Sequence, residues 1–321
     1  MIAVQEFIVP FLVLLLCSAA VVSVLAFILS LGLRQHLMRL APRMRLPALA
    51  LLLITPFFGT SLLAVWGSAP NRWISVNDHC TGHAASHSSA CTWHLPQVTD
   101  PILQGLLLAG LLIFALLGAY KLLNLWRGLH QLKTLKRLAI FDTKLGVWRL
   151  SVGSSMAFTS GLWRPACFIS EGLLQQINAV EVAQVCAHEQ AHARRRDGLR
   201  QWILRFLSWG HLPGTRRQLL KDWELACEQA CDQAVAPDTK NRLVLAQTLL
   251  RVARLQLDNN STLPSASHLN GGDLESRIQA LLHPTAHRPL AALLLASAPV
   301  LIIITTVGAL APILHRWLEW L

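Results

Sequence analysis

Charged side chains are scarce in this sequence. Aspartate, glutamate, lysine and arginine together make up 14% of the 321 residues, whereas hydrophobic residues make up 53%. The mean hydropathy is +0.45, a positive value that soluble enzymes rarely reach. This composition excludes an ordinary soluble enzyme and predicts a protein that lies largely within a membrane.

Four apolar runs are each long enough to cross a bilayer, which takes roughly 20 residues. They cover residues 7–33, 46–66, 102–119 and 289–313. The first run lacks the basic segment that precedes the core of a signal peptide, and it is far longer than the roughly 7–15 residues of such a core. The sequence therefore predicts four transmembrane helices, the first of them retained.

Acidic residues are few, 17 against 28 basic ones, and the basic ones are unevenly spread. Segment 121–288 holds 22 of them and the link between the first two runs holds four. Because Lys and Arg concentrate on the cytoplasmic side, we expect a multi-pass protein of the inner (cytoplasmic) membrane with extracytoplasmic N- and C-termini. The predicted parts are three helices with an outer loop at 69–101 (1–120), a cytoplasmic domain (121–288), and a fourth helix with a short tail (289–321).

The basic excess does not require a nucleic-acid partner. Segment 121–288 has 22 basic and 13 acidic residues, a balance that suits a domain lying against anionic headgroups. The sequence contains no nucleic-acid-binding motif. We expect the membrane to be a partner and no direct contact with nucleic acid.

The cytoplasmic segment shows mixed α+β patterning. It opens with a basic helical stretch, 121–141, that we expect to extend the third helix along the membrane surface. Short apolar runs broken by Gly and Pro at 146–170 predict two or three strands. The polar segment 257–273 predicts a flexible loop, and helical patterns cover 171–197, 199–210, 215–236, 240–257 and 273–283.

The stretch VCAHEQAHARRRDG, residues 185–198, carries the HExxH pattern of zinc peptidases. His188 and His192 are four residues apart, so on a helix both imidazoles project from one face and can bind the same metal ion. Glu189 is positioned to take a proton from water bound to that metal. The other interpretation is two surface histidines on a basic helix.

The boundaries of this helix follow from its flanking residues. Asn178 followed by Glu181 forms a capping box, which predicts the first turn. Gly198 is expected to close the far end, because glycine readily adopts the left-handed conformation of a helix C-terminus.

A third ligand is expected from KDWELACEQACDQAVA, residues 221–236. Glu224, Glu228 and Asp232 fall on one face of a helix whose other residues are mostly small and apolar. A solvated charged face is one explanation, but buried carboxylates need a partner such as a metal with its histidines. We take Glu228 as the ligand, Asp232 as the acceptor for a ligand imidazole N–H, and Glu224 as the competing ligand.

These motifs resemble a known family. HEQAHARRRD followed by EQACDQAV is similar to the BlaR/MecR-type antirepressor metallopeptidases, integral membrane gluzincins with HExxH followed by ExxCD. Segments 157–174 and 274–284 resemble those ahead of the family's zinc helix and before its last span. The resemblance implies an α-helical integral membrane protein with four transmembrane helices and a cytoplasmic α+β zincin-like (gluzincin) protease domain.

The resemblance also implies roles for the matching residues. His188, His192 and Glu228 would bind one catalytic Zn²⁺, Glu189 would be the general base, and Asp232 would orient a ligand. The strand around 157–159 would be an edge for an extended protein substrate. The implied function is a zinc-dependent endopeptidase that, after an extracytoplasmic signal, cleaves itself or a cytoplasmic transcriptional repressor of the BlaI type.

One departure from the family pattern concerns the signal. Antirepressors that respond to β-lactams carry a large extracellular penicillin-binding sensor domain after the last helix. This sequence ends at Leu321, a few residues after its fourth apolar run. We therefore expect no such sensor domain and no sensing through a covalent serine.

The outer loop is rich in cysteine and histidine. Residues 77–96, NDHCTGHAASHSSACTWHLP, contain two CxxH units, Cys80 with His83 and Cys91 with His94. Thiolates and imidazoles together suit zinc or copper ions, which predicts a second metal site. The alternative is a disulfide between the two cysteines, natural in an oxidising compartment. No CxxCH is present, so a c-type haem is excluded.

Two other functions fit the same motifs. The first is a membrane quality-control protease like the HtpX group, which shares HExxH and a later glutamate. The second is a non-catalytic metal or redox receptor that works through a bound partner. Function that survives a Glu189→Gln substitution would favour the receptor.

Overall fold

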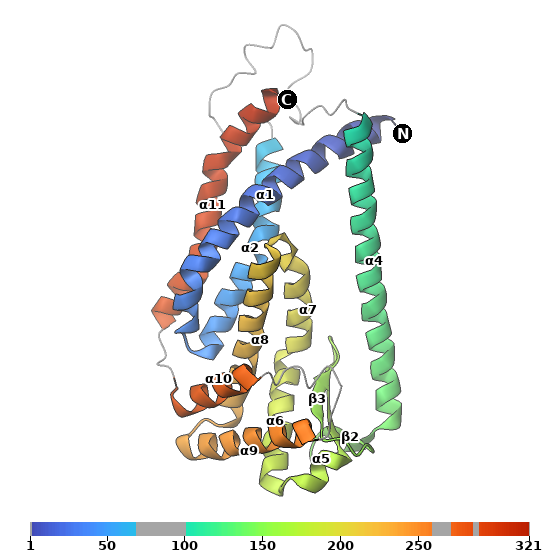
Figure 1. Cartoon of the computed structure of the whole chain (residues 1–321), viewed down its shortest axis with the longest axis vertical. Coiled ribbons are helices and arrows are strands. Elements are labelled where there is room, and N and C mark those ends of the chain that lie inside the picture. Colours follow the sequence, from blue (N-terminus) through green and yellow to red (C-terminus); the bar gives the residue numbers. More distant parts are fainter. Residues whose placement is uncertain (1, 69–100, 259–270, 285–288, 321) are drawn as a thin grey trace.

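Long helices dominate the structure. The computed structural model describes residues 2–68, 101–258, 271–284 and 289–320. Within these residues, four helices are long and apolar enough to cross a membrane, in agreement with the four apolar runs of the sequence. They are α1 (Ile2–Met38), α2 (Pro42–Ser68), α4 (Pro101–Leu138) and α11 (Pro289–Trp320) (Figure 1).

Helices α1, α2 and α11 pack against one another. Val22, Leu63, Ile303 and Val307 form a buried cluster between them. Gly59 allows the close approach, because a Cβ atom there would lie 2.9 Å from a methyl group of Val22 and 3.1 Å from one of Ile303. The three helices therefore form one bundle held by interlocking apolar side chains.

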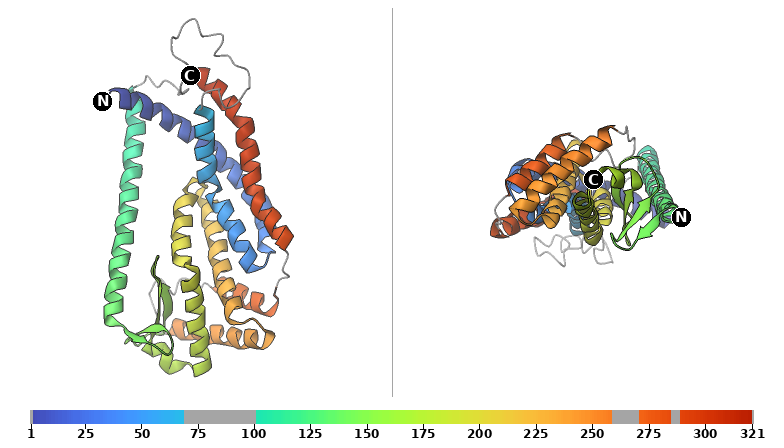
Figure 2. Two further views of the ribbon diagram at one scale, coloured as in Figure 1. Left: turned by 180° about the vertical axis from the view of Figure 1, so that it is seen from behind. Right: turned by 90° about the horizontal axis from the view of Figure 1, so that it is seen from below.

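Helix α4 stands apart from this bundle (Figures 1 and 2). No residue in the most apolar part of α4 is buried against the rest of the described protein. The basic stretch 121–138 continues α4 as one straight helix, because no proline after Pro101 and no loop interrupts it. The expectation that this stretch extends the third helix is therefore confirmed, whereas its position along the membrane surface stays a prediction.

A small four-stranded sheet follows α4, with strand order β1-β2-β4-β3. Its strands are β1 (Ile140–Asp142), β2 (Val147–Leu150), β3 (Ala157–Ser160) and β4 (Ala166–Ser170). Strands β2 and β4 are parallel and the other pairs are antiparallel. Three of the strands lie where the sequence predicts them, and β3 is at one edge.

Strand β1 was not predicted, because its residues continue the apolar pattern of the preceding helix. A tight turn after Asp142 reverses the chain, so that β1 can pair with β2. Asp142 Oδ1 accepts hydrogen bonds from the backbone N–H groups of Lys144 and Leu145. Gly146 then adopts a positive φ of 67°, a conformation that glycine takes at little cost.

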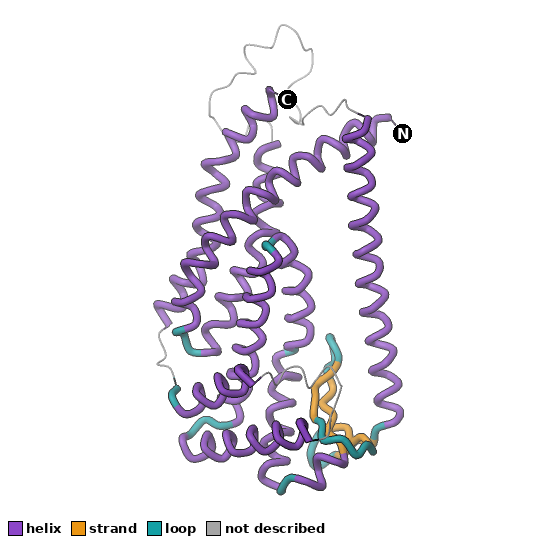
Figure 3. The backbone as a smooth tube through the Cα atoms, viewed as in Figure 1, coloured by secondary structure: helices purple, strands orange, loops and turns teal. Residues whose placement is uncertain are grey.

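The remaining helices lie mostly on one side of the sheet, and some of them reach back to the bundle (Figure 3). The capping box predicted at the start of the HExxH helix is confirmed, since Asn178 and Glu181 bond reciprocally. These helices are α5 (Glu171–Gln176), α6 (Ala179–Arg195), α7 (Asp197–Leu207), α8 (Pro213–Val235), α9 (Thr239–Asp258) and α10 (Gly271–Leu282), with the 3-10 turn η2 (Ser208–Gly210) between α7 and α8.

The end predicted for the HExxH helix is wrong. Helix α6 stops at Arg195, and Gly198 already lies within α7. The left-handed residue is Arg196, at φ 53° and ψ 46°, whose N–H bonds to the carbonyls of His192 and Ala193. This turn brings Asp197, the first residue of α7, beside the histidines of α6.

The segment after α4 shares its core with the membrane helices. Leu37, Leu49, Leu219, Trp223 and Ala226 belong to one buried cluster that joins α1, α2 and α8.

The α7–α8 hairpin reaches deep along the bundle. At its tip, Ser23 Oγ of α1 donates to the carbonyl of Gly210, and His211 Nε2 lies 3.0 Å from the carbonyl of Leu52 in α2. Position 52 lies in the middle of the candidate span of α2, which runs from Pro42 to Trp66. The hairpin, whose second helix α8 carries Glu228, is thus packed directly on the membrane helices.

This packing predicts a strong steric effect at Gly210. A Cβ atom there would lie 2.7 Å from Cβ of Pro56 in α2, so Gly210→Val must push the hairpin away. We expect a loss of about 1–3 kcal/mol, typical of overpacking, measured as a lower melting temperature of the purified protein in detergent. Gly214→Ala is the control, because no atom lies within 4 Å of its added Cβ. Equal melting temperatures for the two variants would contradict the close packing.

Candidate metal centre

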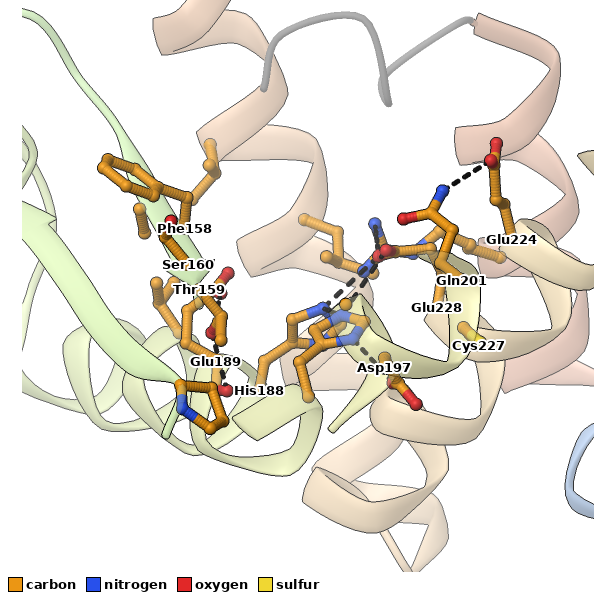
Figure 4. Close-up of a pocket in the computed structure, with 18 of the residues that line it drawn as sticks. Phe158, Thr159, Ser160, His188, Glu189, Asp197, Gln201, Glu224, Cys227 and Glu228 are labelled. Carbon is orange, nitrogen blue, oxygen red and sulfur yellow. Dashed lines mark hydrogen bonds and ion pairs between the residues drawn. The ribbon is translucent and has the colours of Figure 1, made fainter. Parts of the chain in front are cut away.

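Three side chains from two helices meet in the interior. His188 and His192 lie one turn apart on α6, and Glu228 faces them from α8 (Figure 4). The Nε2 atoms of the two imidazoles are 3.1 Å apart. Glu228 Oε2 lies 3.3 Å from His188 Nε2, and Glu228 Oε1 lies 3.4 Å from His192 Nε2. The three groups that the sequence analysis proposed as ligands are therefore in mutual contact.

The donor set and its spacing fit a metal ion. Ligand atoms bound tetrahedrally to zinc at 2.0–2.1 Å are about 3.3 Å from one another, which is close to the separations of these nitrogen and oxygen atoms. Two imidazoles and one carboxylate are also the protein ligands of many catalytic zinc sites. This cluster could hold a metal ion and leave one coordination position open.

Each imidazole has a carboxylate on its other nitrogen. His188 Nδ1 lies 3.1 Å from Asp232 Oδ1, an ion-pair distance without the alignment of a hydrogen bond. His192 Nδ1 lies 2.9 Å from Asp197 Oδ2. Such partners orient ligand imidazoles and select which nitrogen faces the metal. The sequence pattern predicted the role of Asp232 but not that of Asp197, because the left-handed turn at Arg196 that brings Asp197 back to His192 leaves no pattern in the sequence.

A buried arginine completes the cluster. Arg277 of α10 donates to both carboxylate oxygens of Asp232, at 2.8 and 2.7 Å, and its Nη1 lies 3.0 Å from Glu228 Oε2. The role of Arg277 was not predicted from the sequence either. One feature of the sequence could have pointed to it. Arg277 is the only basic residue of α10, so it is not part of a solvent-exposed basic face of that helix.

The charges of the cluster shift its pKa values. Burial by itself lowers the pKa of His188. The carboxylates of Asp232 and Glu228 raise it by more than that, so the pKa is about 9. The pKa of His192 is also raised, by Asp197 and Glu228 against the effect of burial. Burial raises the pKa of Glu228, but Arg277 and the imidazoles hold it well below the usual range. The carboxylates are thus ionised, and protons are held on the histidines.

Glu189 lies on the sheet side of the cluster, beside β3 (Figure 4). Its Oε2 accepts a hydrogen bond from Thr159 Oγ1 at 2.7 Å. Both residues line a cleft of about 470 Å³ that also contains His188, His192 and Glu228. The residues 157–159, which the sequence analysis proposed as a substrate edge, thus form one wall of this cleft as part of the edge strand β3.

Glu224, the competing ligand of the sequence analysis, points elsewhere in the same cleft. Its Oε1 accepts from Gln201 Nε2 at 2.6 Å and from Arg205 Nη2 at 2.8 Å. It is not part of the group of atoms that converge at His188 and His192. The structure therefore separates the three carboxylates of α8, with Glu228 and Asp232 at the histidines and Glu224 bound to α7.

Comparison with known proteins identifies the family of the chain. A family model described as BlaR1 peptidase M56 matches residues 14–281, most of the chain. The chain belongs to the BlaR1 peptidase family. No curated protein and no solved structure matches the chain. Family membership makes the protein a membrane-associated metallopeptidase of the BlaR1 type, and the match includes every residue of the cluster.

The structure of this BlaR1-type peptidase describes only some of the cysteines. Cys80 and Cys91, with His83 and His94, lie outside the described residues, so the second metal site and the disulfide both stay predictions. The four cysteines after α4 that the structure describes, Cys167, Cys186, Cys227 and Cys231, are all buried. Burial raises the pKa of the Cys186 thiol to about 11, which keeps that thiol protonated and unreactive.

The position of Arg277 predicts a large loss of stability when its charge is removed. Arg277→Leu leaves the carboxylates of Glu228 and Asp232 buried without their cation, which costs about 3–5 kcal/mol. Thermal unfolding of metal-free protein would show this loss, and added zinc should restore part of it, because the ion supplies positive charge. Arg254→Leu, at an exposed position of α9, is the control and should change stability by less than about 0.5 kcal/mol. Wild-type stability in Arg277→Leu would contradict the ion cluster.

Proposed function

We propose that the protein is a zinc-dependent endopeptidase whose active site is the cleft between α6, α8 and β3. The observation that carries this proposal is the convergence of His188, His192 and Glu228, with Glu189 next to them in the same cleft. His188, His192 and Glu228 hold the zinc ion, and Asp232 and Asp197 orient the two imidazoles. When bound, the ion lowers the pKa of water toward about 7 and polarises a peptide carbonyl.

Glu189 is the general base of the proposed reaction. It accepts a proton from the attacking water and later returns that proton to the leaving amine nitrogen. Thr159 supports this role, because its hydroxyl donates to the Glu189 carboxylate and holds it on the sheet side of the cleft. A base fixed between the metal ligands and the substrate strand can reach both the water and the scissile bond.

The proposed substrate is a protein segment in extended conformation. Among the residues that the structure describes, strand β3 pairs only with β4, so its other edge offers backbone N–H and C=O groups to an added strand. The distribution of Lys and Arg supports a cytoplasmic location for this cleft. By the chemistry of its family, the substrate is a cytoplasmic repressor, or the peptidase itself, and cleavage follows a signal from the other side of the membrane.

The decisive test compares the wild type with Glu189→Gln. Both proteins should bind zinc, measured by atomic emission, because Glu189 is not a ligand. The variant should cleave a proteome-derived peptide library, and itself, about 10²–10⁴-fold more slowly, which is the usual contribution of a general base. Mass spectrometry of the products measures both reactions.

Glu171→Gln is the matched control, since Glu171 begins α5 and lies outside the cleft. It should keep both the zinc and the cleavage rate. Cleavage by Glu189→Gln at the wild-type rate, or the absence of zinc from all three proteins, would refute the peptidase mechanism. Zinc without cleavage in the wild type would favour a metal receptor.

Zinc affinity should depend on pH. Zinc binds the neutral imidazole, but neighbouring carboxylates raise the pKa of His188 to about 9 and also raise the pKa of His192. At least one proton must leave when the metal binds, so the affinity should rise by about tenfold or more for each pH unit between pH 6 and 8. Competition with a fluorescent chelator at three pH values measures this dependence. An affinity that does not change over that range would show that the histidines are neutral or not ligands.

A further inference from the structure

A second cavity lies behind α6, on the side away from the candidate metal centre. Its volume is about 740 Å³. Its apolar surface comes from three helices that are far apart in the sequence, namely α2 with Leu46 and Ala50, α7 with Ile203 and Leu204, and α8 with Trp223. A surface of this kind favours a ligand with an apolar part.

The rest of the cavity is strongly basic. Arg43, Arg194, Arg195 and Arg200 line it, and within the described part of the chain no acidic side chain does. Arg195 forms an ion pair with Asp197. Among the described residues, the other three have no acidic partner and are exposed. A ligand that satisfies this cavity must therefore be anionic as well as partly apolar.

The location of the cavity identifies the class of ligand. Residues 43–50 form the first turns of α2, whose candidate span begins at Pro42. The cavity therefore lies where this helix enters the membrane, within reach of phospholipid headgroups. We propose that the cavity binds an anionic phospholipid, with the phosphate at Arg194 and Arg200 and part of an acyl chain on the apolar surface of α2 and α7.

The cavity is physically connected to the candidate metal centre. Trp223 lines both this cavity and the catalytic cleft. Arg195, in the cavity wall, pairs with Asp197 Oδ1, and the other oxygen of that carboxylate faces His192 Nδ1. A bound lipid holds α6 against α2 and α8. On the basis of the proposed function, peptidase activity should therefore be higher in membranes that contain anionic lipid.

Photocrosslinking tests the binding directly and does not depend on catalysis. The full chain is placed in nanodiscs with a photoactivatable phosphatidylglycerol, and labelled peptides are identified by mass spectrometry. We expect labels on the segments 43–50 and 194–204. Arg194→Gln with Arg200→Gln should reduce labelling more than tenfold, because each arginine near a lipid surface contributes about a factor of five. Arg254→Gln, an exposed arginine of α9, is the control and should leave labelling unchanged.

Two further measurements guard against a folding defect and against other ligands. Ala234→Trp fills the cavity from an exposed position of α8 and should reduce labelling without changing any charge. Glu189→Gln should be labelled like the wild type, which separates this proposal from the peptidase mechanism. Equal labelling by a phosphatidylcholine analogue, competition by inorganic phosphate, or wild-type labelling of the double arginine variant would each overturn the proposal.

Discussion

The buried cation of Arg277 is the interaction on which the site depends. Charges that leave water are costly unless they are paired and hydrogen-bonded. Arg277 pairs with both Asp232 and Glu228, and Asp232 in turn faces His188. One ion cluster thereby connects α10, α8 and α6. That cation offsets much of the cost of keeping two buried carboxylates ionised side by side at the histidines.

Helix α8 connects this cluster to the membrane. One of its faces carries Glu228 toward the histidines, and another packs on α2 within the shared core. Polar contacts add to the apolar ones, because Asp222 pairs with Arg34 of α1 at 2.6 Å and Gln229 bonds to Arg45 of α2 at 3.1 Å. Since close-packed interiors transmit small displacements, a shift of α1 or α2 would move the helix that carries Glu228.

Several features followed from the sequence because they are local. Four apolar runs predicted four long helices, and Asn178 with Glu181 predicted the start of α6. The spacing of His188 and His192 required only helical geometry to bring both imidazoles to one face. Strand β1 and the end of α6 were not predicted. One depends on a turn at Asp142, and the other on a left-handed arginine where the pattern favoured Gly198.

What the sequence determined by itself is the class of protein and the types of side chain in the site, since composition and helical periodicity suffice for both. Only the tertiary structure brought Asp197 and Arg277 to the histidines, because the first needs the turn at Arg196 and the second comes from a helix about 50 residues beyond Glu228. Only the tertiary structure distinguishes the three arginines at 194–196, which the sequence shows as one basic patch. The structure gives each of them a different environment, since Arg194 lines the second cavity, Arg195 pairs with Asp197, and Arg196 forms the left-handed turn.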